Sequence, residues 1–199
     1  KIFFNFLAFS FSSSKDTKSK ENLSASIQEM GTTFIKLGQF LATRPDIIGE
    51  KLSKELVSLQ DKLPPFSKKE AEKIIIENLG QSNFDDIIDL SDPIAAASIA
   101  QVHKAKIKED NTIKNVAIKV LRPNIKKIFN EEIDAIMLLA YIVESLITKT
   151  KRLKLIEVVF LFKEITNHEM DLRFEAAAAN EYAENTKNDL GFFVPKIYW

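Results

Sequence analysis

Apolar side chains recur every three or four positions along most of the chain, which is the spacing that buries one face of a helix. Five stretches show this spacing and are predicted to be helices: 24–44, 46–62, 67–79, 125–147 and 155–186. Ser24 and Ser67 stand where an N-cap is expected, and a Glu three residues after Ser67 has capping-box spacing. Pro45 and Gly80 are expected to end helices, and the last stretch to break near Asn167.

A different pattern occupies the middle of the chain. Residues 99–107 and 115–121 are rich in β-branched residues and flank a polar turn at 109–111, which predicts a β-hairpin. Residues 84–90 are expected to form a connector, and the apolar residues 192–198 the beginning of another strand. Several helices with one small antiparallel sheet place the chain in the α+β class.

The first eleven residues are apolar and aromatic. They cover only about half of the ~20 residues that a membrane-spanning helix needs. A helix at a membrane interface or in a core is favoured over a signal peptide, because no small-residue cleavage pattern follows. Residues 12–20 are serine-rich and charged, as in a linker. The sequence therefore predicts no transmembrane span.

Composition limits the chemistry that the chain can perform. Lysine plus arginine equal aspartate plus glutamate at 28 each, so no overall charge favours nucleic acid or an anionic membrane. The absence of cysteine excludes disulfides, thiolate nucleophiles and cysteine metal ligands. His103 and His168 lack the paired spacing of a zinc helix, and no metal site is predicted among these residues.

A polar group interrupts the apolar face of the first predicted helix. Lys36, Gly38 and Gln39 stand beside Ile35 and Phe40, and polar side chains at such a position usually meet a partner. When this segment is considered by itself, an amphipathic helix whose lysine extends to solvent is the better explanation. The motifs further along the chain reverse that preference.

A lysine and a small-residue loop point to phosphate chemistry. Residues 116–119, Val-Ala-Ile-Lys, have the form of the kinase strand whose lysine holds the α- and β-phosphates of ATP. Residues 95–98, Ala-Ala-Ala-Ser, stand where a kinase has its glycine-rich loop, and small side chains let backbone N–H groups approach a polyphosphate. Many strands end in a lysine and many alanines form packing surfaces, so neither motif is specific by itself.

Three carboxylates in the last predicted helix are candidates to orient that lysine. Asp171 and Glu175 are four residues apart and are expected to share a helix face, while Glu169 is expected to pair with Arg173. A solvated charged face is the alternative. Because a phosphate-binding lysine needs an orienting carboxylate, a role in the site is favoured. Whether Lys119 pairs with Glu175 or with Glu169 stays open.

In combination and in order, these motifs resemble those of the UbiB family, which are atypical protein-kinase-like proteins linked to ubiquinone biosynthesis. The motifs that carry the resemblance are Lys-Leu-Gly-Gln at 36–39, Ala-Ala-Ala-Ser-Ile-Ala-Gln-Val-His at 95–103, Val-Ala-Ile-Lys at 116–119 with Arg-Pro at 122–123, Glu-x-Asp at 169–171, and Glu-Ala at 175–176 before Asn180. The resemblance covers residues 23–199. Thr32 stands where many members of the family carry proline.

The resemblance implies a protein-kinase-like N-lobe, formed by a small antiparallel sheet and helices and preceded by a helical extension. The chain is then expected to divide into an apolar segment with a linker (1–22), the extension (23–90) and an incomplete N-lobe (91–199), with the C-lobe absent. In the family the extension folds over the active site. The resemblance therefore assigns a lid to Lys36, Gly38 and Gln39.

The resemblance also assigns roles to the other candidates. The catalytic group would comprise Lys119, Glu169, Asp171 and Glu175, with Glu169 and Asp171 receiving the lid. The nucleotide-binding group would comprise Ala95, Ala96, Ala97, Ser98 and Lys119. The lid disfavours ordinary protein kinase activity, and so does the alanine loop, because alanine restricts a loop more than glycine does.

The function implied for the parent protein is that of an atypical kinase or ATPase, a transferase of phosphorus-containing groups, which binds ATP with Mg²⁺ and supports ubiquinone (coenzyme Q) biosynthesis. Its magnesium ligands are expected after Trp199, so these 199 residues are expected to be inactive by themselves. The implied partners are a quinone-precursor lipid and ubiquinone-biosynthesis proteins, at the cytoplasmic face of a bacterial inner membrane or its organellar equivalent.

Two rival functions come from other classes. One is a non-catalytic scaffold or lipid-handling module with a regulatory nucleotide site, which the aromatic N-terminal run and the long helix at 125–147 would suit. The other is nucleic-acid binding through four basic residues: Lys149, Lys151, Arg152 and Lys154. In a chain without net charge such residues more often form a solvated loop, so no nucleic-acid partner is predicted.

Overall fold

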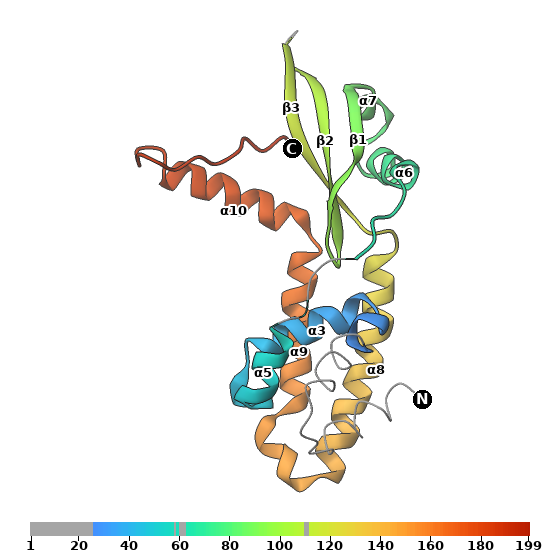
Figure 1. The fold of residues 1–199 in the computed structure, drawn as a ribbon, viewed down its shortest axis with the longest axis vertical. Helices are drawn as coiled ribbons and strands as arrows, with labels where there is room; N and C mark the ends of the chain where they lie inside the picture. The colour runs from blue at the N-terminus through green and yellow to red at the C-terminus, as the bar shows by residue number, and fades with distance from the viewer. Residues whose placement is uncertain (1–25, 58, 60–62, 110–111) are drawn as a thin grey trace. The chain divides into compact units, whose positions relative to one another are not determined.

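The computed structural model describes residues 26–57, 59, 63–109 and 112–199, which divide into two compact units (Figure 1). One unit extends to Glu132 and the other covers Ile133–Trp199. The apolar segment predicted over residues 1–22, the cap predicted at Ser24 and most of the turn predicted at 109–111 lie outside the described residues.

The first unit contains the short helices α3 (Thr32–Ala42), α4 (Pro45–Ile48) and α5 (Glu50–Leu56). Gly31 precedes α3, and Gly49 separates α4 from α5. The prediction of continuous helices over 24–44 and 46–62 was wrong, because Gly31 (φ 102°) and Gly49 (φ 82°) adopt backbone angles that interrupt a helix. Pro45 occupies the first turn of α4, where its missing N–H has no helical partner to lose.

These helices share a small apolar core. The buried side chains that form it are Ile27, Ile35, Leu56 and Leu59. The Ser53 hydroxyl of α5 also donates a 2.6 Å hydrogen bond to the Ala42 carbonyl at the end of α3, which joins the two helices by a polar contact. An apolar cluster and a polar link therefore both join α3 to α5.

Helix α6 (Lys68–Leu79) begins and ends where the sequence predicts. The Ser67 hydroxyl accepts a 3.2 Å hydrogen bond from the Glu70 N–H, which confirms the N-cap. Gly80, with φ 82°, ends the helix. Helix α7 (Gln81–Asp85) follows, in part of the stretch that was expected to be a connector.

Three antiparallel strands follow within the described residues, in the order β1-β2-β3. They are β1 (Ile87–Ala96), β2 (Ala100–Glu109) and β3 (Thr112–Leu121). The predicted hairpin is confirmed, since β2 and β3 pair without a register shift from Ala100↔Leu121 to Glu109↔Thr112. The predicted small antiparallel sheet with helices is confirmed with it.

Strand β1 was not predicted, and the expectation of a connector over 84–90 was wrong. Its sequence contains Asp89, Asp92 and Pro93, residue types that are depleted in strands. The sheet accepts them because β1 is an edge strand whose pairing with β2 shifts register on both sides of Pro93. Edge position and register shifts are tertiary features that the local pattern does not contain.

One face of the sheet packs on α6. Ala71 and Ile75 of the helix are buried against Leu90, Ala105 and Val120, one residue from each strand. Helix α6 lies in the part of the chain that was assigned to the extension, although it packs on the sheet. The division proposed at residue 90 stays a prediction.

The second unit continues from the long helix α8 (Ile125–Leu146), which confirms the helix predicted there. The four basic residues expected in a loop lie in or next to a short 3₁₀ helix, η1 (Thr148–Leu153). Helix α9 (Leu155–Glu169) returns beside α8: the Glu144 carboxylate accepts a hydrogen bond from the Ile156 N–H, and Lys163 pairs with Asp134 at 3.5 Å. None of the described helices is both long and apolar enough to cross a membrane.

The last predicted helix is divided at Met170-Asp171, three residues after the predicted position, and α10 (Leu172–Asn185) follows. Residues 192–199 form neither helix nor strand, so the strand expected there is not present in this structure. An apolar run needs a pairing partner to become a strand, and the described sheet ends at β3.

Candidate functional site

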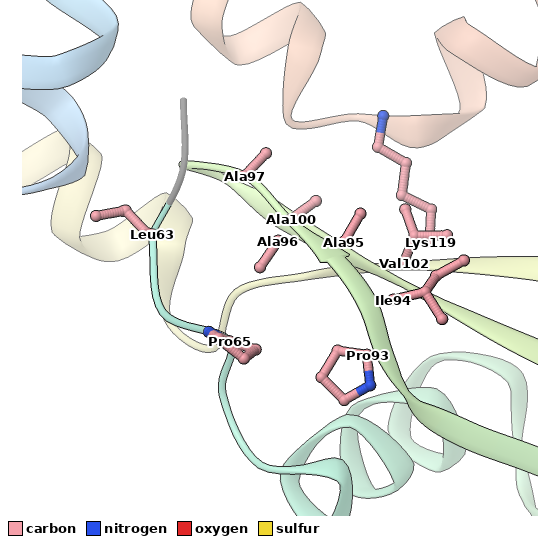
Figure 2. Close-up of a pocket in the computed structure, with 10 residues that line it drawn as sticks. All are labelled: Leu63, Pro65, Pro93, Ile94, Ala95, Ala96, Ala97, Ala100, Val102 and Lys119. Carbon is pink, nitrogen blue, oxygen red and sulfur yellow. The ribbon is translucent and has the colours of Figure 1, made fainter. Parts of the chain in front are cut away.

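Three residues from the three strands form a row across the sheet. Val102 of β2 pairs with Ala95 of β1 on one side and with Lys119 of β3 on the other. Directly opposed residues project to the same face of an antiparallel sheet, so Lys119 shares a face with Ala95 at the end of β1, with Val102 of β2 between them. Figure 2 shows the Lys119 side chain rising from β3 beside Val102 and Ala95.

The alternation of side chains along β2 and β3 identifies the face of the sheet on which Lys119 and Val102 lie. On either side of Lys119, Ile118 and Val120 belong to the core that the sheet forms with α6. On either side of Val102, Gln101 and His103 are fully buried. Lys119 and Val102 therefore occupy the face opposite α6, where no helix of that core covers the strands.

A pocket of about 720 Å³ within the first unit includes Val102 and Lys119 of this face in its lining. Nine of its lining residues are apolar and the tenth is a cation (Figure 2): Leu63, Pro65, Pro93, Ile94, Ala95, Ala96, Ala97, Ala100, Val102 and Lys119. Its volume falls in the range of roughly 300–1,000 Å³ that is usual for small-molecule sites. Such a lining suits a ligand with an apolar part and an anionic part.

The predicted alanine loop forms the tight turn between β1 and β2. Ala95 and Ala96 end β1, and the Ala97 N–H donates a 2.8 Å hydrogen bond to the Ala100 carbonyl. The structure thus brings Ala95, Ala96 and Ala97 together with Lys119 around one pocket. Ser98 is fully buried and does not contribute to the lining, so its predicted contact with phosphate stays a prediction.

The lid residues lie on α3. Lys36 and Gln39 are half-buried, while Gly38 is buried and faces Leu59. A Cβ atom added to Gly38 would collide with the Leu59 Cδ1 atom, which gives this glycine a packing role of its own. None of the three lines the pocket, and their closure over it stays a prediction.

The candidate carboxylates lie around the break between α9 and α10. Glu169 ends α9, Asp171 is the N-cap of α10 and Glu175 lies in its first turn. They do not share one continuous helix as expected, because the Asp171 side chain accepts the Arg173 N–H at 3.1 Å and starts a new one. Their pairing with Lys119 stays a prediction.

Arg173 pairs with Asp171 rather than with Glu169, which was the expected partner. Its Nε and Nη2 atoms lie 2.8 Å and 2.5 Å from the two carboxylate oxygens. This hydrogen bonding, and then the negative charge of Asp171, raises the pKa of Arg173 above its ordinary value. Asp171 is therefore engaged on two sides, as a helix cap and as an ion-pair partner.

Three polar residues that hold the pocket wall were not singled out in the sequence. They are Gln101, His103 and Arg122. Gln101 and His103 belong to the 95–103 motif and Arg122 follows the strand lysine. Gln101 and Arg122 bond to the backbone of a distant segment, and His103 bonds to Gln101. Gln101 reaches 35 residues back to Phe66, and Arg122 reaches 58 residues back to Pro64.

Within the described part of the chain, no three His, Asp or Glu side chains gather closely enough to hold a metal ion. The expectation that Mg²⁺ ligands lie after Trp199 stays a prediction. The charge of the pocket lining comes from the lysine.

Comparison with known proteins identifies relatives over most of the chain. Residues 58–199 match the family model described as the ABC1 atypical kinase-like domain. Curated relatives named "Probable protein kinase UbiB" from Azotobacter vinelandii and Pseudomonas fluorescens are 37% and 36% identical over 183 residues, which is 89% of this chain and 33% of each relative. A relative with the same name from Marinobacter nauticus is 35% identical over 180 residues, or 90% of this chain and 32% of its own. The chain thus spans about a third of the length of these relatives.

Proposed function

Because this chain belongs to the ABC1 atypical kinase-like family, and so confirms its resemblance to UbiB proteins, we propose that its pocket binds the nucleotide of an ATP-dependent kinase or ATPase. The observation that carries the proposal is the row of Ala95, Val102 and Lys119 across the sheet, at the wall of a pocket with a single cation. Such a row suits a polyphosphate attached to an apolar base.

Different residues of the pocket would contact different parts of the ligand. The Lys119 ammonium group would neutralise the phosphates, as the strand lysine of kinases does. The alanine turn would lie over the phosphates, with small side chains that allow a close approach. The apolar wall, to which Leu63 and Pro65 contribute, would receive the base.

The remaining parts of the proposal concern the whole protein. A carboxylate of the α9–α10 junction, Glu169 or Glu175, would orient Lys119, and Lys36 and Gln39 would close the site. Mg²⁺ would supply the neutralisation of charge that phosphoryl transfer requires. The activity would support ubiquinone biosynthesis at the cytoplasmic face of a membrane, with a quinone-precursor lipid and other proteins of that process as partners. Transfer to protein substrates is disfavoured, because an alanine turn bends less freely than a glycine loop.

Substitution of Lys119 by Met tests the proposal, because it removes the charge and keeps most of the side-chain length. A ligand at 100 times its Kd stabilises a protein by about 2.7 kcal/mol, so ATP should raise the melting temperature of the natural full-length protein by several degrees. We expect Lys119→Met to abolish that rise.

The matched control is Lys106→Met, in the same sheet. Lys106 forms a 2.9 Å ion pair with Asp89, is exposed, and does not line the pocket. We expect this variant to keep the full stabilisation by ATP. Retention of the ATP effect in Lys119→Met would refute the role of Lys119.

A further inference from the structure

One wall of the pocket is a short proline segment, residues 63–66, that hydrogen bonds attach to the sheet at two points. The Arg122 Nη2 atom donates to the Pro64 carbonyl at 3.0 Å. The Gln101 side chain accepts the Phe66 N–H at 3.0 Å and donates to the Phe66 carbonyl at 3.2 Å. Pro65, between the two attachment points, lines the pocket.

Arg122 also holds the opposite side of the pocket. Its Nε atom donates to the Ala97 carbonyl at 3.0 Å, and its backbone N–H donates to the Ile99 carbonyl at 2.9 Å. One planar guanidinium group therefore bridges the alanine turn and the proline segment. A lysine, which is a point donor on a flexible stem, cannot reproduce this two-way geometry.

His103 fixes the orientation of Gln101. The His103 Nδ1 atom lies 2.9 Å from the Ser91 carbonyl, which only accepts, so Nδ1 carries the proton. The Nε2 atom is then an acceptor for the Gln101 Nε2 atom at 2.9 Å. With its amide nitrogen directed toward His103 and the Phe66 carbonyl, Gln101 presents its oxygen to the Phe66 N–H.

The burial of these groups differs from that of the segment they hold. Gln101 and His103 are fully buried, whereas Pro64 and Pro65 are exposed. Burial of the prolines themselves therefore contributes little to their position. The hydrogen bonds act together with the ends of the segment, where Leu63 packs on the apolar cluster of α3 and α5, and Phe66 packs on the core of α6 and the sheet, 5.9 Å below the Arg122 guanidinium group. Loss of these bonds should move the wall without removing the core that the sheet forms with α6.

We propose that Arg122, Gln101 and His103, which we call the proline clamp, are positioning residues that set nucleotide affinity by holding the 63–66 segment and the alanine turn at a fixed separation. The inference rests on the proposed function. A pocket whose walls are fixed before binding avoids the entropic cost of ordering them when the ligand enters.

The test uses Arg122→Lys and Gln101→Met in the natural full-length protein, with ADP and ATP affinity measured by calorimetry and backbone amide exchange by mass spectrometry. We expect each variant to bind nucleotide about tenfold more weakly, which corresponds to the loss of about one charge-assisted or buried hydrogen bond. Exchange should quicken at Ala97 in Arg122→Lys, although the Ala97 N–H bonds to Ala100 and not to Arg122.

A control separates positioning from general stability. Ile75→Val removes one methylene group from the core between α6 and the sheet and takes away none of the clamp's hydrogen-bonding groups. We expect it to lower the melting temperature and to leave nucleotide affinity and Ala97 exchange unchanged. A loss of affinity in Ile75→Val that equals the loss in the clamp variants would assign the clamp a merely structural role and overturn the proposal.

Two further outcomes distinguish failure of the clamp inference from failure of the proposed function. If the unsubstituted protein binds nucleotide and Arg122→Lys binds it equally well, the clamp inference fails while the proposed function stands. If the unsubstituted protein binds no nucleotide, the proposed function fails and this inference fails with it. If Gln101→Met does not fold, Arg122→Lys still tests the clamp, because Arg122 is only half-buried and its replacement should leave the fold intact.

Discussion

At the scale of single residues, two separate reasons account for the glycine at position 38. The sequence places it inside a motif whose family role is a lid, and the structure buries it on α3 against the Leu59 side chain. Glycine inside a helix costs stability relative to alanine, by roughly 1 kcal/mol. The close approach of Leu59 explains why that cost is tolerated here.

Gly38→Val should therefore destabilise the extension by about 2 kcal/mol, because a branched side chain overlaps Leu59 and overpacks the cluster of α3 and α5. Amide exchange in α3 would measure the change directly as a lower free energy of local opening. Gly38→Ala is the graded comparison, with a smaller effect because higher helix propensity offsets part of the overlap. Unchanged exchange in Gly38→Val would show that Leu59 has other space to occupy.

Residue-level expectations held best where the interaction is local in sequence. The Ser67 cap involves residues three apart and was predicted to the residue. The partner of Arg173 was wrong by two positions, because Asp171 stops α9 and caps α10. A pairing rule that assumes one continuous helix does not apply across such a break.

At the scale of elements, the β2–β3 hairpin and α6 follow from the pattern, and β1 does not. The hairpin has β-branched runs around a polar turn, and its pairing is regular along its length. Strand β1 has two register shifts around a proline and reads locally as a loop. Only the presence of β2 as a partner makes it a strand.

The cap of α6 provides an element-scale prediction. Ser67→Ala should lower the free energy of unfolding by about 1 kcal/mol, because the Glu70 N–H loses its acceptor. Urea unfolding followed by circular dichroism would measure the difference. Ser67→Asp is the matched control and should retain the stability, since aspartate is an equally good cap at neutral pH. Equal loss in both variants would contradict the capping explanation.

At the scale of the whole molecule, the balance of 28 basic and 28 acidic residues bears on possible partners. The basic residues around η1 are partly compensated, since Lys154 pairs with Glu157 at 2.9 Å. This hydrogen bond, and then the charge of Glu157, raises the pKa of Lys154 above its ordinary value. A non-specific nucleic-acid surface would need an uncompensated basic patch.

We therefore expect no binding of duplex DNA or of RNA by this protein at about 0.1 M salt, where counterion release still favours basic proteins. Fluorescence anisotropy with labelled oligonucleotides would measure it. As a positive comparison, Glu157→Lys removes the compensation beside η1 and should produce weak binding that salt abolishes. Salt-dependent binding by the unsubstituted protein would restore the nucleic-acid alternative.

The sequence by itself determined the features that depend on neighbours along the chain. Helical periodicity placed α6 and α8, the Ser67 cap fixed the start of α6, β-branched runs around a polar turn placed the β2–β3 hairpin, and motif order placed Lys119 in its strand. Each rests on interactions between residues a few positions apart, which spacing records directly.

Only the tertiary structure decided which groups meet across long stretches of sequence. It joined β1 to β2, placed Lys119 on the face opposite α6, and attached Phe66 to Gln101 and Pro64 to Arg122 across 35 and 58 residues. Glutamine and arginine side chains can bond to any exposed backbone group, so their residue types do not specify a partner. The partner is specified by the packing of α6 on the sheet, which brings the proline segment to the edge of the pocket.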